Sequence, residues 1–288
     1  MDYRLSYTPI IADSSRHHLI SYNRRMEKIT SDDAEISYDI AGTGPSVVLL
    51  HPTPADHEFF LPVSQFLSSK YRLIIPDLRG HGESSLGNGP ASMQKHAFDV
   101  ARVMDHAGVD RAPLLGVSIG GRVIFEFWRR FRDRVTALVL CNTEARADSP
   151  EARANRLRNA EDVLKRGTEP FFESMLPKLL GETTRRSRPD LVEGALRMAR
   201  RMSAEDVAGV QLGMAERPDS VSSLRTITVP TLIITGDEDV LTGVPDAELM
   251  KQNISGSEMR VVAKAGHFSP WEQPEEVGKL LRNYLDRI

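Results

Sequence analysis

The segment Gly116-Val117-Ser118-Ile119-Gly120-Gly121 decides the fold of this chain, because Gly-x-Ser-x-Gly is the form of a sharp turn from a strand into a helix. An apolar run, 112–115, precedes the segment, and a helix-like run, 122–131, follows it. Glycines remove the side chains that would collide where the two backbones meet. The segment therefore predicts a serine held at the start of a helix, where free N–H groups favour a negatively charged oxygen.

Two later segments supply a carboxylate and an imidazole, in the order Ser, acid, His: Gly236-Asp237-Glu238-Asp239 and Ala265-Gly266-His267. A serine hydroxyl becomes a strong nucleophile only when a base removes its proton, and an acid orients that base. His267 is the expected base, because it lies between the last predicted strand and a C-terminal helix. The residue pattern leaves the acid open between Asp237 and Asp239, with Glu238 and Asp246 as weaker candidates.

A loop after the third predicted strand, His51-Pro52-Thr53-Pro54, is the expected source of a backbone donor for an oxyanion. Proline has no N–H, so Pro52 cannot donate, whereas the Thr53 amide can. Pro54 restricts Thr53 to extended dihedral angles, and the bond between them is a candidate for the cis form. We therefore predict Thr53 as an oxyanion donor; a rigid turn without a catalytic part is the alternative.

Composition and charge limit the classes of function. The chain has 288 residues, 40% hydrophobic and 27% charged, with a formal net charge of -3 and one cysteine, Cys141. These values predict a globular protein and give no support for nucleic-acid binding, a membrane span or an intramolecular disulfide. The charged, glycine-rich run 77–84 lacks the pattern of a phosphate loop or a zinc site, so we expect no cofactor and no metal. Without a signal-peptide pattern, a cytoplasmic location is expected.

Apolar runs alternate with amphipathic runs, which predicts an α/β fold with a mostly parallel sheet. Between Thr143 and Val229 no strand is predicted, and Ser149-Pro150, Thr168-Glu169-Pro170 and Ser203-Ala204-Glu205 are typical of helix starts. We infer a core of residues 24–145 and 225–288, a helical cap of residues 146–224 after the sixth strand, and an N-terminal extension of residues 1–23. The eight predicted strands are Met26–Ile29, Glu35–Ile40, Val47–Leu50, Leu73–Ile75, Pro113–Val117, Ala137–Leu140, Thr231–Thr235 and Met259–Val262.

Arginines are frequent in the predicted cap. They form either a solvated face or, for one of them, a clamp on a carboxylate of the substrate. The six arginines in question are Arg185, Arg186, Arg188, Arg197, Arg200 and Arg201.

The chain resembles the α/β-hydrolase superfamily from about Arg24 to Ile288. The resemblance is carried by His51, the run 77–84, the turn at Ser118, the segment 236–239 and Gly266-His267. The resemblance implies an eight-stranded, mostly parallel sheet, selects Asp239 as the acid, and makes the amides of Ile119 and Thr53 the oxyanion donors. The segments 116–121, 138–143 and 266–274 are most similar to 3-oxoadipate enol-lactonases and related capped esterases. Pro52 departs from the glycine usual in relatives and changes the expected shape of the oxyanion pocket.

The resemblance implies a serine hydrolase that cleaves a small carboxylic ester or lactone through an acyl-enzyme, as a monomer or homo-oligomer. Serine at the turn excludes relatives that use aspartate there, the haloalkane dehalogenases and epoxide hydrolases. The same three residues also suit a carbon–carbon bond hydrolase of the β-diketone type, a thioesterase or a cofactor-free haloperoxidase-like enzyme. A small-molecule receptor on the same fold is the non-enzymatic alternative.

Overall fold

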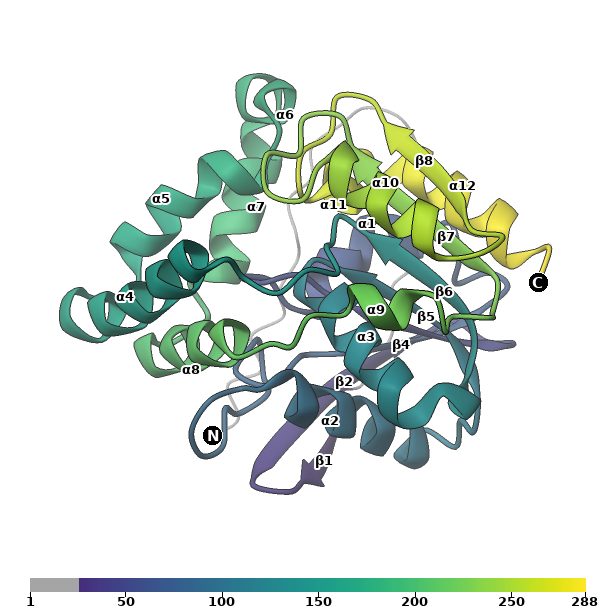
Figure 1. Ribbon diagram of the computed structural model, residues 1–288, viewed down its shortest axis with the longest axis horizontal. Helices are drawn as coiled ribbons and strands as arrows, with labels where there is room; N and C mark the ends of the chain where they lie inside the picture. The colour runs from purple at the N-terminus through teal and green to yellow at the C-terminus, as the bar shows by residue number, and fades with distance from the viewer. Residues whose placement is uncertain (1–25) are drawn as a thin grey trace, which may run out of the picture.

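A computed structural model describes residues 26–288 as a sheet with helices on both faces (Figure 1). The eight strands run in the order β1-β2-β4-β3-β5-β6-β7-β8. Strand β2 is antiparallel to β1 and β4, and the remaining pairs are parallel. This confirms the predicted sheet. The strands are β1 (Glu27–Ser31), β2 (Ala34–Ala41), β3 (Ser46–Leu50), β4 (Arg72–Pro76), β5 (Ala112–Val117), β6 (Val135–Cys141), β7 (Thr231–Gly236) and β8 (Glu258–Val262).

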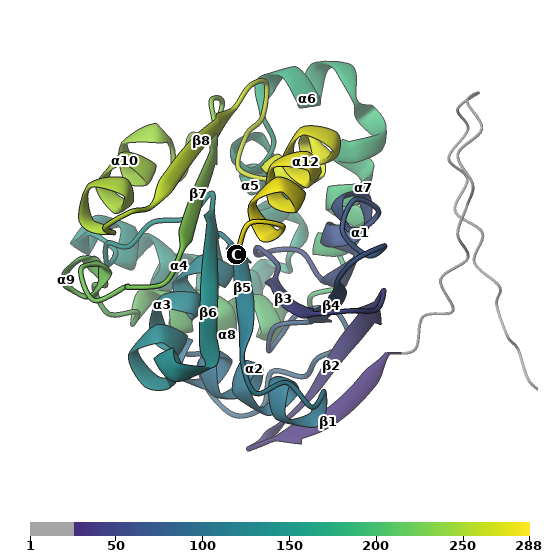
Figure 2. The same ribbon diagram turned by 90° about the vertical axis from the view of Figure 1, so that its right-hand side faces the viewer.

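The central strands are mostly apolar because both of their faces are covered. In β3, Val48 and Leu50 pack into one buried cluster and Val47 and Leu49 into another. Figure 2 shows the two layers: α2, α3 and α10 lie on one side of the sheet, and α1 and α12 on the other. The helices of this core are α1 (Leu61–Ser64), α2 (Met93–His106), α3 (Ile119–Phe131), α9 (Val221–Leu224), α10 (Val244–Asn253), α11 (Ser269–Glu272) and α12 (Pro274–Leu285), with short 3-10 turns at His57–Phe60 and Arg132–Arg134.

Six helices lie between β6 and β7. The first five, here called the inserted helices, stand at one end of the sheet, on the left of Figure 1. Three of them begin where the sequence predicts a helix start, after Ser149, Thr168 and Ser203. Ser203 and Asp206 form a reciprocal capping box at the start of α8. The inserted helices are α4 (Pro150–Arg166), α5 (Glu169–Leu179), α6 (Glu182–Ser187), α7 (Pro189–Ala199) and α8 (Ala204–Ala215).

Helices α4 and α8 pack against each other, and α8 also lies against a core loop. A Cβ added to Gly213 would stand 1.9 Å from the Ala91 carbonyl oxygen, and one added to Gly209 would meet the Leu86 side chain. Helix α8 is therefore held tightly against the core. The division into a core and a cap at residues 146 and 224 stays a prediction, and the predicted extension 1–23 lies outside the described residues. No described helix is both long and apolar enough to cross a bilayer.

Candidate active site

Ser118 stands between β5 and α3 in a strained backbone conformation, with φ 54° and ψ −114°. A non-glycine residue in such a region costs about 1–3 kcal/mol and persists only where its surroundings hold it. Here the Ser118 N–H donates to the Cys141 carbonyl at 3.1 Å, and the Thr143 hydroxyl donates to the Ser118 carbonyl at 2.8 Å. Both partners come from the end of β6, so the neighbouring strand fixes the turn.

The small residues around Ser118 are required by close backbone contacts. A Cβ on Gly116 would lie 2.4 Å from the Gly120 carbonyl carbon, and a Cβ on Gly120 would lie 2.2 Å from the Leu50 carbonyl oxygen. Real Cβ atoms do not approach other atoms this closely. The glycines of the quoted segment therefore let α3 begin directly over β3 and β5.

His267 and Asp239 are brought together at the carboxyl edge of the sheet. The His267 Nδ1 atom lies 3.1 Å and 3.0 Å from the two carboxylate oxygens of Asp239. The side chains of both residues are almost completely buried. Because an ionised carboxylate can only accept, Nδ1 carries the hydrogen, which leaves Nε2 as the basic nitrogen.

Asp239 accepts four further hydrogen bonds, which come from the three residues Leu241, Thr242 and Asn142. The Leu241 and Thr242 N–H groups donate to Oδ1 at 2.8 and 3.0 Å. The Asn142 amide and the Thr242 hydroxyl donate to Oδ2 at 2.9 and 3.0 Å. Burial favours the neutral acid, but the charge and hydrogen bond of His267, with the Asn142 and Thr242 donors, outweigh it and lower the pKa of the Asp239 carboxyl well below its ordinary value.

Asn142 and Thr242 are contacts that the sequence reasoning missed. Asn142 is fully buried, with φ 44°, and its amide also donates to the Gly266 carbonyl at 3.1 Å. It therefore connects the loop that carries His267 to Asp239. Its position was a usable signal, because a polar residue directly after a buried parallel strand lies at the edge where Ser118 and His267 were expected.

The other candidate acids face elsewhere. Asp237 accepts from the Ala265 N–H at 3.3 Å. Glu238 accepts from the Thr183 N–H at 2.8 Å and so links the core to an inserted helix. Asp246 pairs with Arg146 at 2.7 Å. Of the four carboxylates considered, Asp239 is the one that contacts His267.

The two expected oxyanion donors have free amides. Ile119 is the first residue of α3, and Thr53 precedes a cis peptide bond to Pro54. Among the described residues, neither N–H donates to a protein acceptor. The Pro52 carbonyl accepts from the Ala55 N–H at 3.1 Å and contacts His51 Nδ1 at 2.8 Å, so Pro52 belongs to a fixed turn.

Ser118, His267 and Thr53 line one cavity of about 420 Å³ between the core and the inserted helices. Among the described hydrogen bonds, none joins the Ser118 hydroxyl to the His267 ring. Such contacts are often long in a free enzyme and tighten when substrate binds. Apolar side chains on the cavity wall are Phe171, Met175, Leu179, Met214 and Leu241.

None of the six arginines singled out in the predicted cap lines this cavity. Arg201 pairs with the buried Asp56 at 2.7 Å and Arg200 with the exposed Glu169 at 2.7 Å, so both side chains are engaged outside the cavity. The arginines of the cavity are four others: Arg122, Arg146, Arg156 and Arg217.

One group of described side chains, Asp56, His57 and Asp77, brings potential metal ligands within 4.8 Å of one another. Its oxygens already accept hydrogen bonds. Asp77 accepts from the His57 N–H at 2.7 Å and the Glu83 N–H at 2.9 Å, and Asp56 pairs with Arg201. The group is therefore explained as the anchor of the 77–84 loop.

Comparisons with known proteins show the family of this chain. The model of the α/β hydrolase fold family matches residues 45–274. 3-Oxoadipate enol-lactonase 2 of Acinetobacter baylyi is 27% identical over 264 residues, covering 91% of this chain and 97% of that protein. A thermophilic esterase from Thermogutta terrifontis, solved with malate bound, is 39% identical, with a TM-score of 0.88 over 91% of this chain and 98% of that one.

The enol-lactonase from Burkholderia xenovorans LB400 is 25% identical, with a TM-score of 0.84 over 90% of this chain and 100% of that chain. The matches cover almost the whole length of each of these relatives. With the family model matching most of the sequence, this chain belongs to the α/β-hydrolase fold family.

Proposed function

We propose that this protein is a serine hydrolase that cleaves a carboxylic ester or lactone through an acyl-enzyme, with Ser118, Asp239 and His267 as its catalytic residues. The observation that carries the proposal is the bond from His267 Nδ1 to buried Asp239, on a ring that lines the same cavity as Ser118. The esterase and enol-lactonase relatives support the same reaction class.

In the proposed reaction, His267 Nε2 takes the Ser118 proton while the hydroxyl oxygen attacks the carbonyl carbon. Asp239 keeps the hydrogen on Nδ1 and stabilises the imidazolium that forms. The Ile119 and Thr53 amides donate to the oxyanion; one such donor is worth roughly 3–4 kcal/mol. The alcohol leaves with the proton held by His267, and His267 then activates a water that releases the acid.

The strained backbone conformation at Ser118 contributes to this mechanism. In a turn of this form the serine hydroxyl is exposed above the sheet, and Ile119, whose amide is the proposed donor, follows Ser118 as the first residue of α3. Neither the nucleophile nor the oxyanion donor needs to reorganise during the reaction, which is how fixed dipoles lower a barrier.

Cys141 is the one cysteine of the sequence, and it is buried and free. Disulfides are rare in the cytoplasm, so a chain with one free cysteine supports the cytoplasm as the proposed compartment.

A labelling experiment tests the proposal. A fluorophosphonate probe should label the wild-type protein and not Ser118→Ala, with circular dichroism showing that the variant is folded. Esters and lactones of small acids should be hydrolysed by the wild type and at least ~10³-fold more slowly by the variant. Ser118→Ala with wild-type turnover contradicts the proposed nucleophile, and ligand binding without labelling or hydrolysis would instead favour a receptor. Product analysis with a β-diketone or a thioester separates the remaining alternatives.

A further inference from the structure

One wall of the cavity carries buried guanidinium groups. Arg122 follows Ser118 by four residues, so both residues lie on one face of the start of α3. Arg217 follows the end of α8. The two residues are only 8% and 7% exposed, yet both line the cavity with Ser118. A buried charge needs compensation, so their partners decide what this wall can bind.

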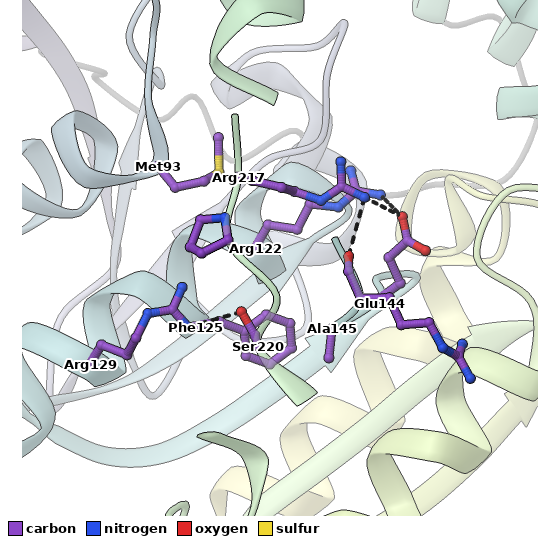
Figure 3. Close-up of a pocket in the computed structure, with 10 residues that line it drawn as sticks. Met93, Arg122, Phe125, Arg129, Glu144, Ala145, Arg217 and Ser220 are labelled. Carbon is purple, nitrogen blue, oxygen red and sulfur yellow. Dashed lines mark hydrogen bonds and ion pairs between the residues drawn. The ribbon is translucent and has the colours of Figure 1, made fainter. Parts of the chain in front are cut away.

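Glu144 is shared between the two arginines. Its Oε1 atom accepts from Arg122 Nη2 at 2.7 Å and from Arg217 Nη2 at 2.9 Å, as Figure 3 shows. Asp148 is shared in the same way by Arg217 and Arg156, each at 2.5 Å. Three guanidinium groups thus face two carboxylates, and one positive charge is left in excess. Arg146, the fourth arginine of the wall, pairs outward with Asp246.

Arg122 retains unused hydrogen-bond donors. Its Nε atom is buried without a partner, and its Nη1 atom has only the Met214 sulfur at 4.0 Å, a weak acceptor. Burial, together with the nearby charge of Arg217, lowers the pKa of Arg122 to about 10, which reflects incomplete compensation. Arg217 Nε is also buried without a partner. These N–H groups therefore have no strong acceptor among the described residues, and a ligand in the cavity could supply one.

We propose that Arg122, assisted by Arg217, binds a free carboxylate on the substrate, so that the enzyme acts on the monoanion of a dicarboxylic half-ester or of a lactone that carries a carboxylate. The inference rests on the proposed function, since the same cavity holds Ser118. A carboxylate matches the planar guanidinium and can accept two of its hydrogens. A monoanion also balances the single excess charge, whereas a phosphate dianion exceeds it.

The test compares a charged and a neutral substrate of one chain length. Monomethyl adipate and dimethyl adipate are hydrolysed under initial-rate conditions, and the ratio of their kcat/KM values is measured. Arg122→Gln should lower this ratio by roughly 10–100-fold, the effect of one hydrogen bond to a charged group. Arg200→Gln makes the same charge change at the C-cap of α7, outside the cavity, and the ratio should stay at the wild-type value.

A second variant predicts the opposite direction. Glu144→Gln removes a carboxylate that competes for both arginines, so KM for the monoanion should fall relative to KM for the diester. Loss of folding cannot imitate this result. An unchanged ratio in Arg122→Gln, or a diester preference in the wild type, overturns the proposal.

Binding measurements keep this inference separate from the proposed hydrolysis. Glutarate is titrated calorimetrically into wild-type protein and into Arg122→Gln, with inorganic phosphate as a second probe. Arg122-dependent glutarate binding without turnover of either ester supports the subsite and contradicts the hydrolase. Ser118-dependent hydrolysis with glutarate binding that ignores Arg122 supports the hydrolase and overturns the subsite. Phosphate binding tighter than glutarate also overturns the carboxylate assignment.

Discussion

The substitution Asp239→Asn tests the reasoning about the buried acid most directly. An asparagine can keep its oxygen toward the Leu241 and Thr242 N–H groups, which now donate to Oδ1. Its NH₂ group then faces His267 Nδ1, which has to become an acceptor. The ring hydrogen moves to Nε2, and the nitrogen that should take the Ser118 proton has no free lone pair.

The expected loss in kcat is about 10⁴-fold, or ~5.5 kcal/mol of transition-state stabilisation, because the wrong tautomer predominates. The effect on stability depends on pH. The folded state lowers the pKa of Asp239, so the ionised carboxylate stabilises the fold above the unfolded pKa of about 4, and this contribution is lost as pH falls through the folded pKa. The stability gap between wild type and Asp239→Asn should therefore be largest near neutral pH and shrink in acid.

Asp237→Asn is the matched control, because the residue lies two positions away and accepts one hydrogen bond, from the Ala265 N–H. Steady-state hydrolysis of a p-nitrophenyl ester gives kcat, and urea unfolding from pH 3 to pH 7 gives stability. We expect near wild-type kcat for Asp237→Asn. A loss under ~10-fold in Asp239→Asn, or an equal loss in both variants, would refute the tautomer argument.

Three further substitutions or treatments follow from the same structure. Asn142→Ala removes the amide that donates to Asp239 and should lower the free energy of unfolding by ~2–3 kcal/mol and kcat by roughly tenfold, as urea unfolding and steady-state kinetics will show. Arg79→Met leaves the buried Asp99 carboxylate without its two guanidinium bonds and should cost ~3–5 kcal/mol, measurable by calorimetry, whereas a neutral effect would contradict the importance of the pair. Burial raises the pKa of the Cys141 thiol to about 12, so iodoacetamide at pH 8 should alkylate Cys141 only after denaturation, and rapid labelling of the native protein would disprove its burial.

The fold was predictable because its signals are local. Short apolar runs without alternation predicted the central strands as buried on both faces, and all eight predicted strands occur in the sheet. The turn at Ser118 was readable for a similar reason: the glycines at 116 and 120 are demanded by contacts within that turn and with the adjacent strand. A hydroxyl before a proline or an acid likewise marked the starts of α4 and α8.

The choice between Asp237 and Asp239 was not readable from residue types. Both carboxylates follow β7 within one turn, and the folding of that turn decides which of them faces His267. The Asp237 N–H donates to Val262 and the Glu238 N–H to Ala265, which fixes the turn against the strand that precedes His267. These partners are distant in sequence, so only the resemblance to a family, and not the local pattern, could select Asp239.

The charge of the cavity depends even more on the assembled fold. The six arginines clustered in the predicted cap left two alternatives open, a solvated face or a carboxylate clamp. Arg188 and Arg200 pair with exposed carboxylates at the surface, which agrees with the first alternative for these two. The arginines of the cavity are dispersed in sequence, and their shared partners, Glu144 and Asp148, lie in the connection after β6. The arginines that cluster in the sequence thus lie outside the cavity. The arginines that line the cavity come from α3, from α4, from the end of α8 and, for Arg146, from the connection after β6. The excess positive charge near Ser118 arises only when these elements pack together. The preference for a substrate therefore depends on the tertiary structure and cannot be predicted from any single sequence motif.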